Sequence, residues 1–366
     1  MAIPRSIQVN RANPSWVHCT ARCGRQAYLA GEGFDHRRGW VERRLQFLTG
    51  IFGCEVAAFA VMTDHFHVVL RMAPEDVDRC SDEEVVRRWL RAYPGHRDEA
   101  DVAEASSVDV EEWKVTKHAA DATWVADRRQ RLSSLSWFMR SLSEPIGRRA
   151  NLEDGCHGRF WEGRFHSTPL LDEAGLLACM VYVDLNPIRA QRATSIAESV
   201  ATSAHLRLSW AQSSGPATRP KKARKESRAR SQNSNKATSD QATNSDAVEP
   251  PWLASLLRLA VRSSDGRVAL DPLQYLQLVE TTGRLVGNDH GGAISDDLPK
   301  LLERIDPDIQ PVTWLRTMSG WRQMSAGSVG RRENLDREAE RRGHRRARTR
   351  CDLFRRRPAV DDRSVG

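Results

Sequence analysis

The chain of 366 residues carries a net charge of +8, with 56 lysines and arginines against 48 aspartates and glutamates. This length allows two domains with a sizeable buried core, and the basic balance suits a polyanionic partner such as nucleic acid. Because no apolar stretch approaches the ~20 residues of a membrane-spanning helix and the start lacks an apolar signal, we expect a cytoplasmic, nucleoid-associated protein with no membrane partner.

Strand and helix patterns alternate through the first part of the chain. Strands are expected where apolar runs are bounded by turn residues, and helices where apolar residues recur at the 3.6-residue spacing. The expected order is strand 16–22, helix 35–52, strands 54–62 and 65–72, helices 81–93 and 132–150, strand 165–170 and a helix capped by Asp172 that ends at Pro187. Ser81 to Glu84 form a capping box for the helix that follows. The strand-helix-strand-strand-helix-strand order predicts a ferredoxin-like α+β fold.

Composition divides the chain into four parts. Residues 1–211 hold these patterns, interrupted by a polar insert at about 94–131 that is hard to assign. Residues 212–249 are basic and rich in Ser, Thr, Ala, Asn and Gln, so we predict a disordered linker that cannot bury enough apolar surface to fold. Apolar runs return at 250–325 and predict a small helical C-terminal domain of unknown role, before an arginine-rich tail at 326–366.

A pair of histidines, His65 and His67, flanks one residue inside a strongly apolar run. On a strand, residues two apart point to the same face, so the two imidazoles would stand side by side and could bind one metal ion. His-x-His is a weak motif when it stands alone. Two ordinary polar positions on a half-exposed strand are the alternative interpretation.

A second pair of candidate residues lies on the helix that ends at Pro187. Tyr182 and Asn186 are four residues apart and therefore share a helix face. A tyrosine hydroxyl can act as a nucleophile, and an asparagine oxygen can bind a hard metal ion. Taken alone, Tyr182 could equally be a core aromatic residue and Asn186 a C-terminal helix cap.

Three motifs follow one another in a characteristic order: Asp64-His-Phe-His67, Gly158-Arg-Phe-Trp-Glu-Gly-Arg-Phe165 and Tyr182-Val-Asp-Leu-Asn-Pro-Ile-Arg-Ala190. They resemble the motifs of the HUH single-tyrosine transposases of bacterial insertion sequences, and within them the REP-associated tyrosine transposases. The resemblance covers roughly residues 10–210, making 1–211 the expected catalytic domain. It implies an antiparallel ferredoxin-like sheet with helices on one face. The long insert after the third strand departs from the compact members of this family.

The resemblance also implies a chemistry. His65, His67 and Asn186 would hold a divalent metal, and their nitrogen and oxygen donors suit Mg²⁺ or Mn²⁺. Tyr182 would attack a phosphodiester of single-stranded hairpin DNA, giving a covalent 5′-phosphotyrosine and a free 3′-OH whose reversal rejoins strands. The function implied is that of a transposase-like DNA strand transferase. Basic and aromatic residues near the tyrosine helix are the DNA-binding candidates: Arg159, Arg164, Arg189 and Trp161.

Two other functions stay open at this level. One is a catalytically idle protein that binds hairpin DNA as a regulator, and the other is a metallohydrolase that uses water as its nucleophile. The intact set of His65, His67, Tyr182 and Asn186 favours the strand transferase. Asp64 is expected at a hairpin turn, with orientation of an imidazole as the alternative. Whether two copies pair into a homodimer is also left open.

Overall fold

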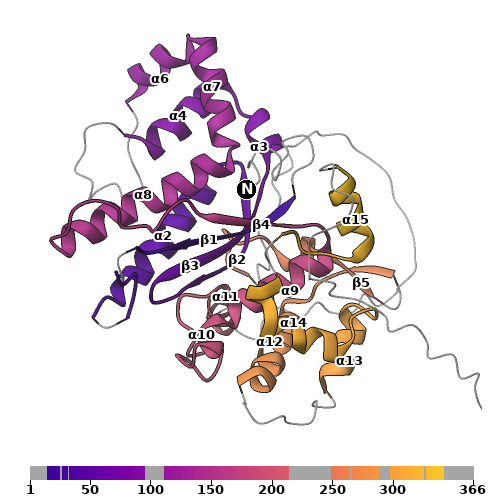
Figure 1. Cartoon of the computed structure of the whole chain (residues 1–366). Coiled ribbons are helices and arrows are strands. Elements are labelled where there is room, and N and C mark those ends of the chain that lie inside the picture. Colours follow the sequence, from indigo (N-terminus) through magenta and orange to yellow (C-terminus); the bar gives the residue numbers. More distant parts are fainter. Residues whose placement is uncertain are drawn as a thin grey trace, which may run out of the picture.

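The computed structural model describes residues 15–24, 27–31, 33–94, 111–213, 249–263, 266–287, 297–324 and 327–341. At its centre is a four-stranded sheet in the order β2-β3-β1-β4, with every neighbouring pair antiparallel (Figure 1). The strands are β1 (Trp16–Arg22), β2 (Cys54–Val61), β3 (His65–Met72) and β4 (His166–Leu170). With helices between β1 and β2 and between β3 and β4, this order is ferredoxin-like, so the predicted α+β fold class is confirmed.

One face of the sheet is covered by two helices, α2 (His36–Thr49) and α8 (Leu135–Glu153). Because alternate residues of a strand point to opposite faces, every second strand residue meets these helices. Large apolar side chains of both layers form one buried core: Val17, Cys19, Phe59, Phe66, Val68 and Leu70 from the strands, and Val41, Leu45, Leu48, Phe138, Leu142 and Ile146 from the helices. These two helices are the pair that the ferredoxin-like pattern places on one face.

The chain between β3 and α8 adds a group of short helices at the top of Figure 1: α3 (Pro74–Asp78), α4 (Asp82–Ala92), α6 (Glu112–Ala119) and α7 (Ala122–Leu132). Ser81 caps α4 as predicted, since its hydroxyl accepts from the backbone N–H of Glu84 at 3.2 Å. Of the predicted insert at 94–131, residues 95–110 lie outside the described part, and α6 and α7 account for most of the remainder.

The other face of the sheet is packed by α9 (Glu173–Asp184), whose residues are nearly all buried. Two small side chains of β2, Ala58 and Ala60, lie in the core that α9 forms with this face, and their size leaves room for the helix. The helix begins at Asp172, whose carboxylate accepts from the backbone N–H of Gly175 at 2.8 Å, as the sequence predicted. Two further helices follow it, α10 (Asn186–Arg189) and α11 (Ser203–Ser213).

The C-terminal part of the chain packs against α9 (Figure 1). Its elements are η1 (Leu256–Arg258), β5 (Ala260–Ser263), β6 (Gly266–Ala269), α12 (Pro272–Gly287), α13 (Asp297–Ile305), α14 (Pro311–Met324) and α15 (Arg332–Arg341). The helices α12, α13 and α14 share one buried core with α9, to which they contribute Tyr275, Leu278, Val279, Leu302, Trp314, Met318 and Trp321. The division into a catalytic domain, linker, second domain and tail stays a prediction, and residues 214–248 and 342–366 lie outside the described part.

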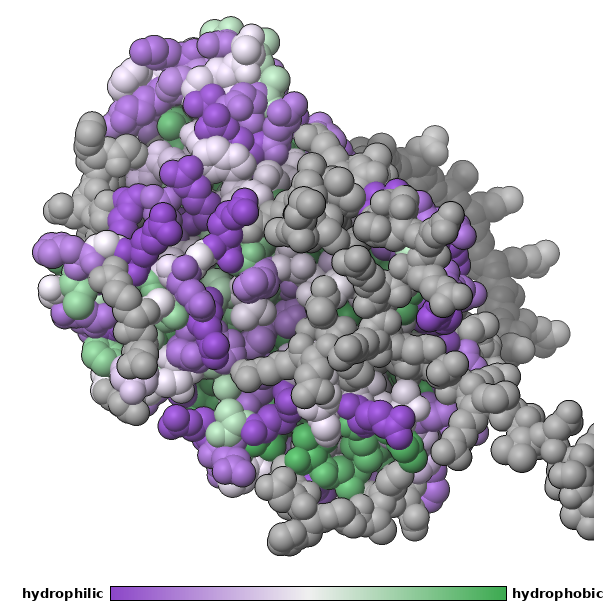
Figure 2. Space-filling view, in the orientation of Figure 1, coloured by the Kyte–Doolittle hydropathy of each residue, from purple (hydrophilic) through white to green (hydrophobic). Residues whose placement is uncertain are grey.

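The surface differs between the two ends of the molecule (Figure 2). The short helices around α6 and α7 are mostly hydrophilic, whereas an apolar patch gathers near α12 at the bottom of the view. Leu273 of α12 and Val312 of α14 are among the exposed large apolar side chains. Within the described ranges, no helix combines the length and the apolar character that crossing a bilayer requires.

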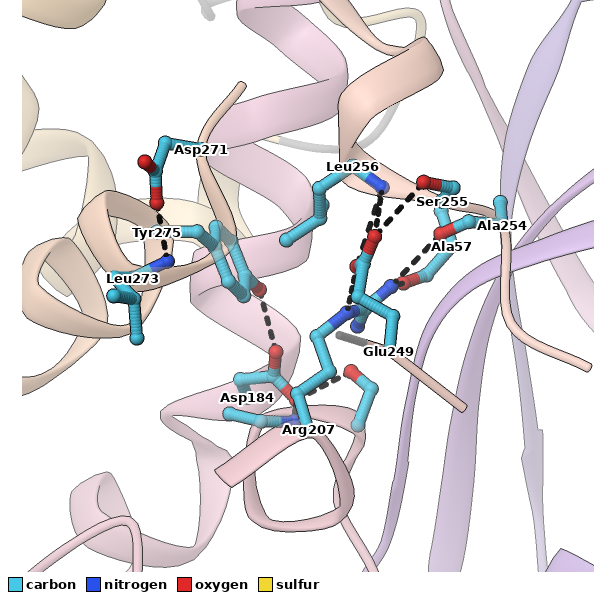
Figure 3. A network of polar contacts seen from close by, with 12 residues as sticks. Ala57, Asp184, Arg207, Glu249, Ala254, Ser255, Leu256, Asp271, Leu273 and Tyr275 are labelled. Atoms are coloured by element: carbon cyan, nitrogen blue, oxygen red, sulfur yellow. Dashed lines mark hydrogen bonds and ion pairs between the residues drawn. The ribbon is translucent and has the colours of Figure 1, made fainter. Parts of the chain in front are cut away.

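A buried ion pair fastens the C-terminal part to the sheet (Figure 3). Arg207 of α11 is only 1% exposed, and its Nε donates to Glu249 at 3.1 Å. Its Nη2 donates to the backbone oxygens of Ala57 on β2 and Ala254, at 3.0 and 3.1 Å. One guanidinium therefore joins the edge of the sheet to the segment that enters the C-terminal part.

A second polar group, Asp184, fixes the end of α9 (Figure 3). Its carboxylate accepts from the hydroxyl of Ser203 at 2.6 Å and from the hydroxyl of Tyr275 at 2.5 Å. Burial raises the pKa of Asp184, although both hydrogen bonds act in the opposite direction. Asp184 thereby ties the end of α9 to α11 and α12, and Tyr182 lies two residues earlier on the same helix.

Replacing Arg207 with methionine should lower the free energy of unfolding by about 3–5 kcal/mol, because the carboxylate of Glu249 is then buried without its partner. Arg207→Met combined with Glu249→Gln should recover part of this loss. Arg284→Met is the matched control, since the Arg284–Glu280 pair is exposed and contributes only about 0.3–0.5 kcal/mol. Urea unfolding measures all three variants. Equal losses for Arg207→Met and Arg284→Met would contradict a structural role for the buried pair.

Candidate functional site

The histidine pair lies on the face of the sheet that α9 covers. Thr20 of β1 pairs with His67 of β3, and Arg22 pairs with His65, so all four side chains share one face. The imidazole centroids of His65 and His67 are 4.8 Å apart, as expected for alternate residues of a strand. Both histidines are buried, which sets them apart from ordinary polar residues on a half-exposed strand.

The ring of His65 is held by a carboxylate. Its Nδ1 lies 2.5 Å from Oδ1 of Asp64, and the other oxygen of Asp64 lies 3.0 Å from Nη2 of Arg22. Burial alone would raise the pKa of Asp64, but the hydrogen bond to His65 and the neighbouring positive charges lower it below its usual value. Asp64 stands between β2 and β3, so it lies at the predicted turn and also orients an imidazole.

The ring of His67 is held by two residues of β1 that the sequence reasoning missed. Nδ1 of His67 lies 2.9 Å from Nε2 of His18 and 3.1 Å from the hydroxyl of Thr20. Burial lowers the pKa of His18 to about 4, with a further contribution from the charge of His65. His18 and Thr20 alternate on a predicted strand, so a shared face was readable from the sequence, whereas their pairing with β3 was not.

The candidate nucleophile, Tyr182, lies on α9 beside the rings of His67 and His18. Its ring centroid lies 6.0 Å from that of His67 and 6.3 Å from that of His18. Trp321 of α14 stacks on the tyrosine at 5.0 Å, and the guanidinium carbon of Arg189 lies 4.7 Å from its ring centre. As a result Tyr182 is only 1% exposed. Trp321 was also missed, because it belongs to the segment predicted as a separate domain.

Asn186 closes the end of the tyrosine helix. Its Nδ2 donates to the backbone oxygens of Tyr182 and Val183, at 3.1 and 3.3 Å, so it acts as the C-terminal cap that was the alternative interpretation. Both bonds use the amide nitrogen and do not occupy the oxygen that a metal would take. A structural role therefore does not exclude Asn186 from the proposed ligand set.

The proposed metal ligands are the imidazoles of His65 and His67 and the side-chain oxygen of Asn186. Among the described residues, no group of three or more His, Cys, Asp or Glu is arranged to hold a metal ion. The two imidazoles are nevertheless each held at Nδ1 by a neighbouring side chain, which is how metal-binding histidines are usually oriented. With Nδ1 engaged in this way, Nε2 is the ring nitrogen through which His65 and His67 would bind a metal.

Three of the four DNA-binding candidates lie on the segment 158–165, and the fourth, Arg189, contacts the tyrosine ring. Arg164 and Trp161 line a cavity of about 360 Å³ between α8 and residues 158–165. Nε1 of Trp161 donates to the backbone oxygen of Ser143 at 2.7 Å, and its ring packs edge-on against Phe66. Arg159 is exposed on the same segment.

This cavity lies at the end of β1 that carries the site. The backbone N–H of Glu162 donates to the oxygen of Arg22 at 2.9 Å, and that of Gly24 donates to the oxygen of Phe160 at 2.7 Å. Ala21 lines the cavity, and its neighbour Arg22 contacts Asp64 on the opposite face. The cavity and the histidine pair therefore lie at the same end of the sheet, on opposite faces.

Neither a protein-family model nor a curated protein matches this sequence. A solved structure, described as a REP-associated tyrosine transposase bound to a REP hairpin, is similar to it over 53% of this chain and 79% of that chain, with 10% sequence identity and a TM-score of 0.31. A likeness this weak carries no inference about function. The function must therefore come from the residues of this chain.

Proposed function

We propose that this protein is a transposase-like DNA strand transferase that cleaves and rejoins single-stranded hairpin DNA through Tyr182. The observation that carries the proposal is the convergence of Tyr182 with His67, 6.0 Å apart between ring centroids, from segments far apart in the sequence. His65, His67 and Asn186 would hold Mg²⁺ or Mn²⁺. When bound, the metal would polarise the scissile phosphate and offset the charge that develops there.

The reaction follows from the tyrosine hydroxyl. Its oxygen forms a bond to phosphorus while the bond between phosphorus and the 3′ oxygen breaks. The phenolic proton is lost to solvent, and the leaving 3′ oxygen gains a proton to become a free 3′-OH. Because the 5′-phosphotyrosine keeps the energy of a phosphodiester, attack by a 3′-OH reverses the step and joins strands.

Arg189 has a specific part in this reaction. Its guanidinium lies over the ring of Tyr182, at 4.7 Å from the ring centre. A positive charge beside the tyrosine would attract the negatively charged phosphate of the incoming DNA. Arg189 is thus the DNA-binding candidate with the most direct contact to the chemistry.

The cavity beside α8 supports a single-stranded partner. Arg140, Arg148 and Arg164 line it together with one acid, Glu144, so its walls carry a positive excess. Trp161 adds an aromatic wall on which an unpaired base can stack. A flexible strand can reach a cavity on one face and a buried tyrosine on the other, whereas a stiff duplex cannot bend around one end of a sheet.

A second candidate function, a catalytically idle regulator that binds hairpin DNA, is favoured by one observation. Tyr182 is 1% exposed, with Trp321 of α14 stacked on its ring, so a phosphate reaches the hydroxyl only after the packing around Tyr182 opens. A regulator needs no such movement. Covalent trapping separates the two functions and also the metallohydrolase, since only the strand transferase leaves DNA bound to the protein.

The movement of α14 gives a measurable prediction. With hairpin DNA and Mn²⁺ present, amide hydrogen exchange should increase over Pro311–Met324, because Trp321 must leave the ring of Tyr182. Exchange over α2, on the other face of the sheet, is the internal control and should stay constant. Unchanged exchange over α14 with no adduct would support the regulator, and unchanged exchange with an adduct would show that no uncovering is needed.

The proposal as a whole is tested with a labelled single-stranded hairpin oligonucleotide. Incubation with the full chain and Mn²⁺ should give a slow-migrating species on a denaturing protein gel, and removal of the metal by a chelator should prevent it. The matched duplex should react poorly. Cleavage without a covalent species would instead point to water as the nucleophile.

A further inference from the structure

His18 and His67 share a buried hydrogen bond between ring nitrogens, with Nε2 of His18 2.9 Å from Nδ1 of His67. We propose that His18 is a positioning residue that accepts the Nδ1 proton of His67 and so holds His67 in the tautomer whose Nε2 can bind a metal. The consequence for metal binding rests on the proposed function, whereas the tautomer of His67 can be measured without it.

The two rings are set by the fold of the sheet. His18 and Thr20 are alternate residues of β1, and Thr20 stands opposite His67 in the antiparallel register. His18 is therefore displaced from His67 by one step along the same face, and the rings stack with centroids 5.0 Å apart. Both are buried, at 6% and 5% exposed, so the contact is direct and shielded from water.

A hydrogen bond between two ring nitrogens has two possible arrangements, because a neutral imidazole carries one ring proton. If His18 donates from Nε2, then His67 carries its own proton on Nε2 and cannot bind a metal there. If His67 donates from Nδ1, its Nε2 presents a lone pair. Only the second arrangement is compatible with His67 as a ligand.

The neighbouring histidine supports this arrangement. Nδ1 of His65 lies 2.5 Å from the carboxylate of Asp64, and an ionised carboxylate can only accept. Asp64 therefore places the proton of His65 on Nδ1 and leaves Nε2 as its metal-binding nitrogen. His18 does for His67 what Asp64 does for His65, so both imidazoles of the pair are presented in the same tautomer.

Other neighbours of His18 hold its ring without choosing the tautomer of His67. The rings of Tyr182 and Trp321 stand edge-on to His18, with centroids 6.3 and 6.4 Å away. The hydroxyl of Thr20, 3.1 Å from Nδ1 of His67, can either donate or accept. We expect removal of the His18 imidazole to change the balance between the two tautomers of His67.

The tautomers are measured by long-range nitrogen–proton correlation in metal-free protein with ¹⁵N-labelled histidine. In the unsubstituted chain, His67 and His65 should both carry the proton on Nδ1. His18→Phe, which keeps a ring of similar size but no acceptor, should shift His67 toward the Nε2-protonated form and leave His65 unchanged. His18→Gln places a polar atom near the position of Nε2 and should restore the original tautomer.

Mn²⁺ binding by calorimetry provides the second measurement. His18→Phe should weaken binding by about 10–100-fold, the usual cost of losing a residue that orients a ligand, and His18→Gln should recover most of it. A proton on Nε2 of His67 in the unsubstituted chain would overturn the proposal, even if His18→Phe failed to fold. So would an unchanged tautomer in a folded His18→Phe. Absence of Mn²⁺ binding in the unsubstituted chain would instead refute the metal site, with the tautomer result still standing.

Discussion

Replacing Tyr182 with phenylalanine should abolish the covalent DNA adduct while leaving the fold and the affinity for hairpin DNA nearly unchanged. The substitution deletes one hydroxyl and keeps the aromatic ring that stacks on Trp321, so packing around α9 is preserved. The free energy of unfolding should change by less than about 1 kcal/mol, since Phe and Tyr have similar volumes. Denaturing gels of the labelled hairpin give the adduct, and filter binding gives the affinity.

Tyr275→Phe is the matched control for this experiment. Tyr275 is also fully buried near α9, but its hydroxyl donates to Asp184 and does not face the histidine pair. Removing this hydroxyl should cost about 1–3 kcal/mol of stability, because a buried carboxylate oxygen of Asp184 loses its donor, with adduct formation retained. An adduct that persists in Tyr182→Phe would assign the nucleophile to another residue, and its loss in both variants would show a merely structural effect.

The second large effect is expected at the histidine pair. His65→Ala and His67→Ala should each weaken Mn²⁺ binding by more than the ~10–100-fold that losing an orienting neighbour costs, and should remove metal-dependent cleavage. Asn186→Ala should have a smaller effect on Mn²⁺ affinity, because water can replace a neutral oxygen ligand. Calorimetric titration of the folded variants measures these affinities.

His36→Ala controls for the loss of a histidine as such. His36 lies on α2, on the other face of the sheet, and pairs with Glu153 at 2.7 Å. Its substitution should leave both Mn²⁺ affinity and cleavage unchanged. If His65→Ala and His67→Ala together bind Mn²⁺ as tightly as the unsubstituted chain, the metal is held elsewhere or not at all.

The fold was accessible from the sequence where local patterns determine it. Apolar runs gave the four strands, and the 3.6-residue spacing gave the helices that cover one face. Ser81 and Asp172 cap their helices as predicted, since an N-cap depends on residues only a few positions apart. The same holds for the shared face of His65 and His67, which follows from the two-residue period of a strand.

The missing parts of the site depend on contacts between distant segments. His18 meets His67 only through the pairing of β1 with β3, across 49 residues, and no local pattern encodes that register. Trp321 meets Tyr182 because α14 packs against α9 in one core. The apolar runs near Leu273 and Leu298 lie in the helices α12 and α13, whereas the run at 252–260 leads into the β5–β6 hairpin. Such runs do not reveal which surface they cover.

The burial of Tyr182 has a consequence for how the site is used. The burial that keeps Tyr182 from water would also keep a phosphate from its hydroxyl, so on the proposed function the site must open before it reacts. Hairpin DNA would have to supply the free energy that separates Trp321 from Tyr182. A ligand shifts such an equilibrium only by its difference in affinity for the two states.

The central claim, that Tyr182 is the nucleophile, is tested most directly by mass-spectrometric mapping of the reacted protein. The full chain is incubated with single-stranded hairpin DNA and Mn²⁺, digested with nuclease and protease, and searched for a peptide that retains a nucleotide. We expect a single modified peptide, with the phosphate on Tyr182. A nucleotide on any other residue, or cleaved DNA with a free 5′-phosphate and no modified peptide, would contradict the account.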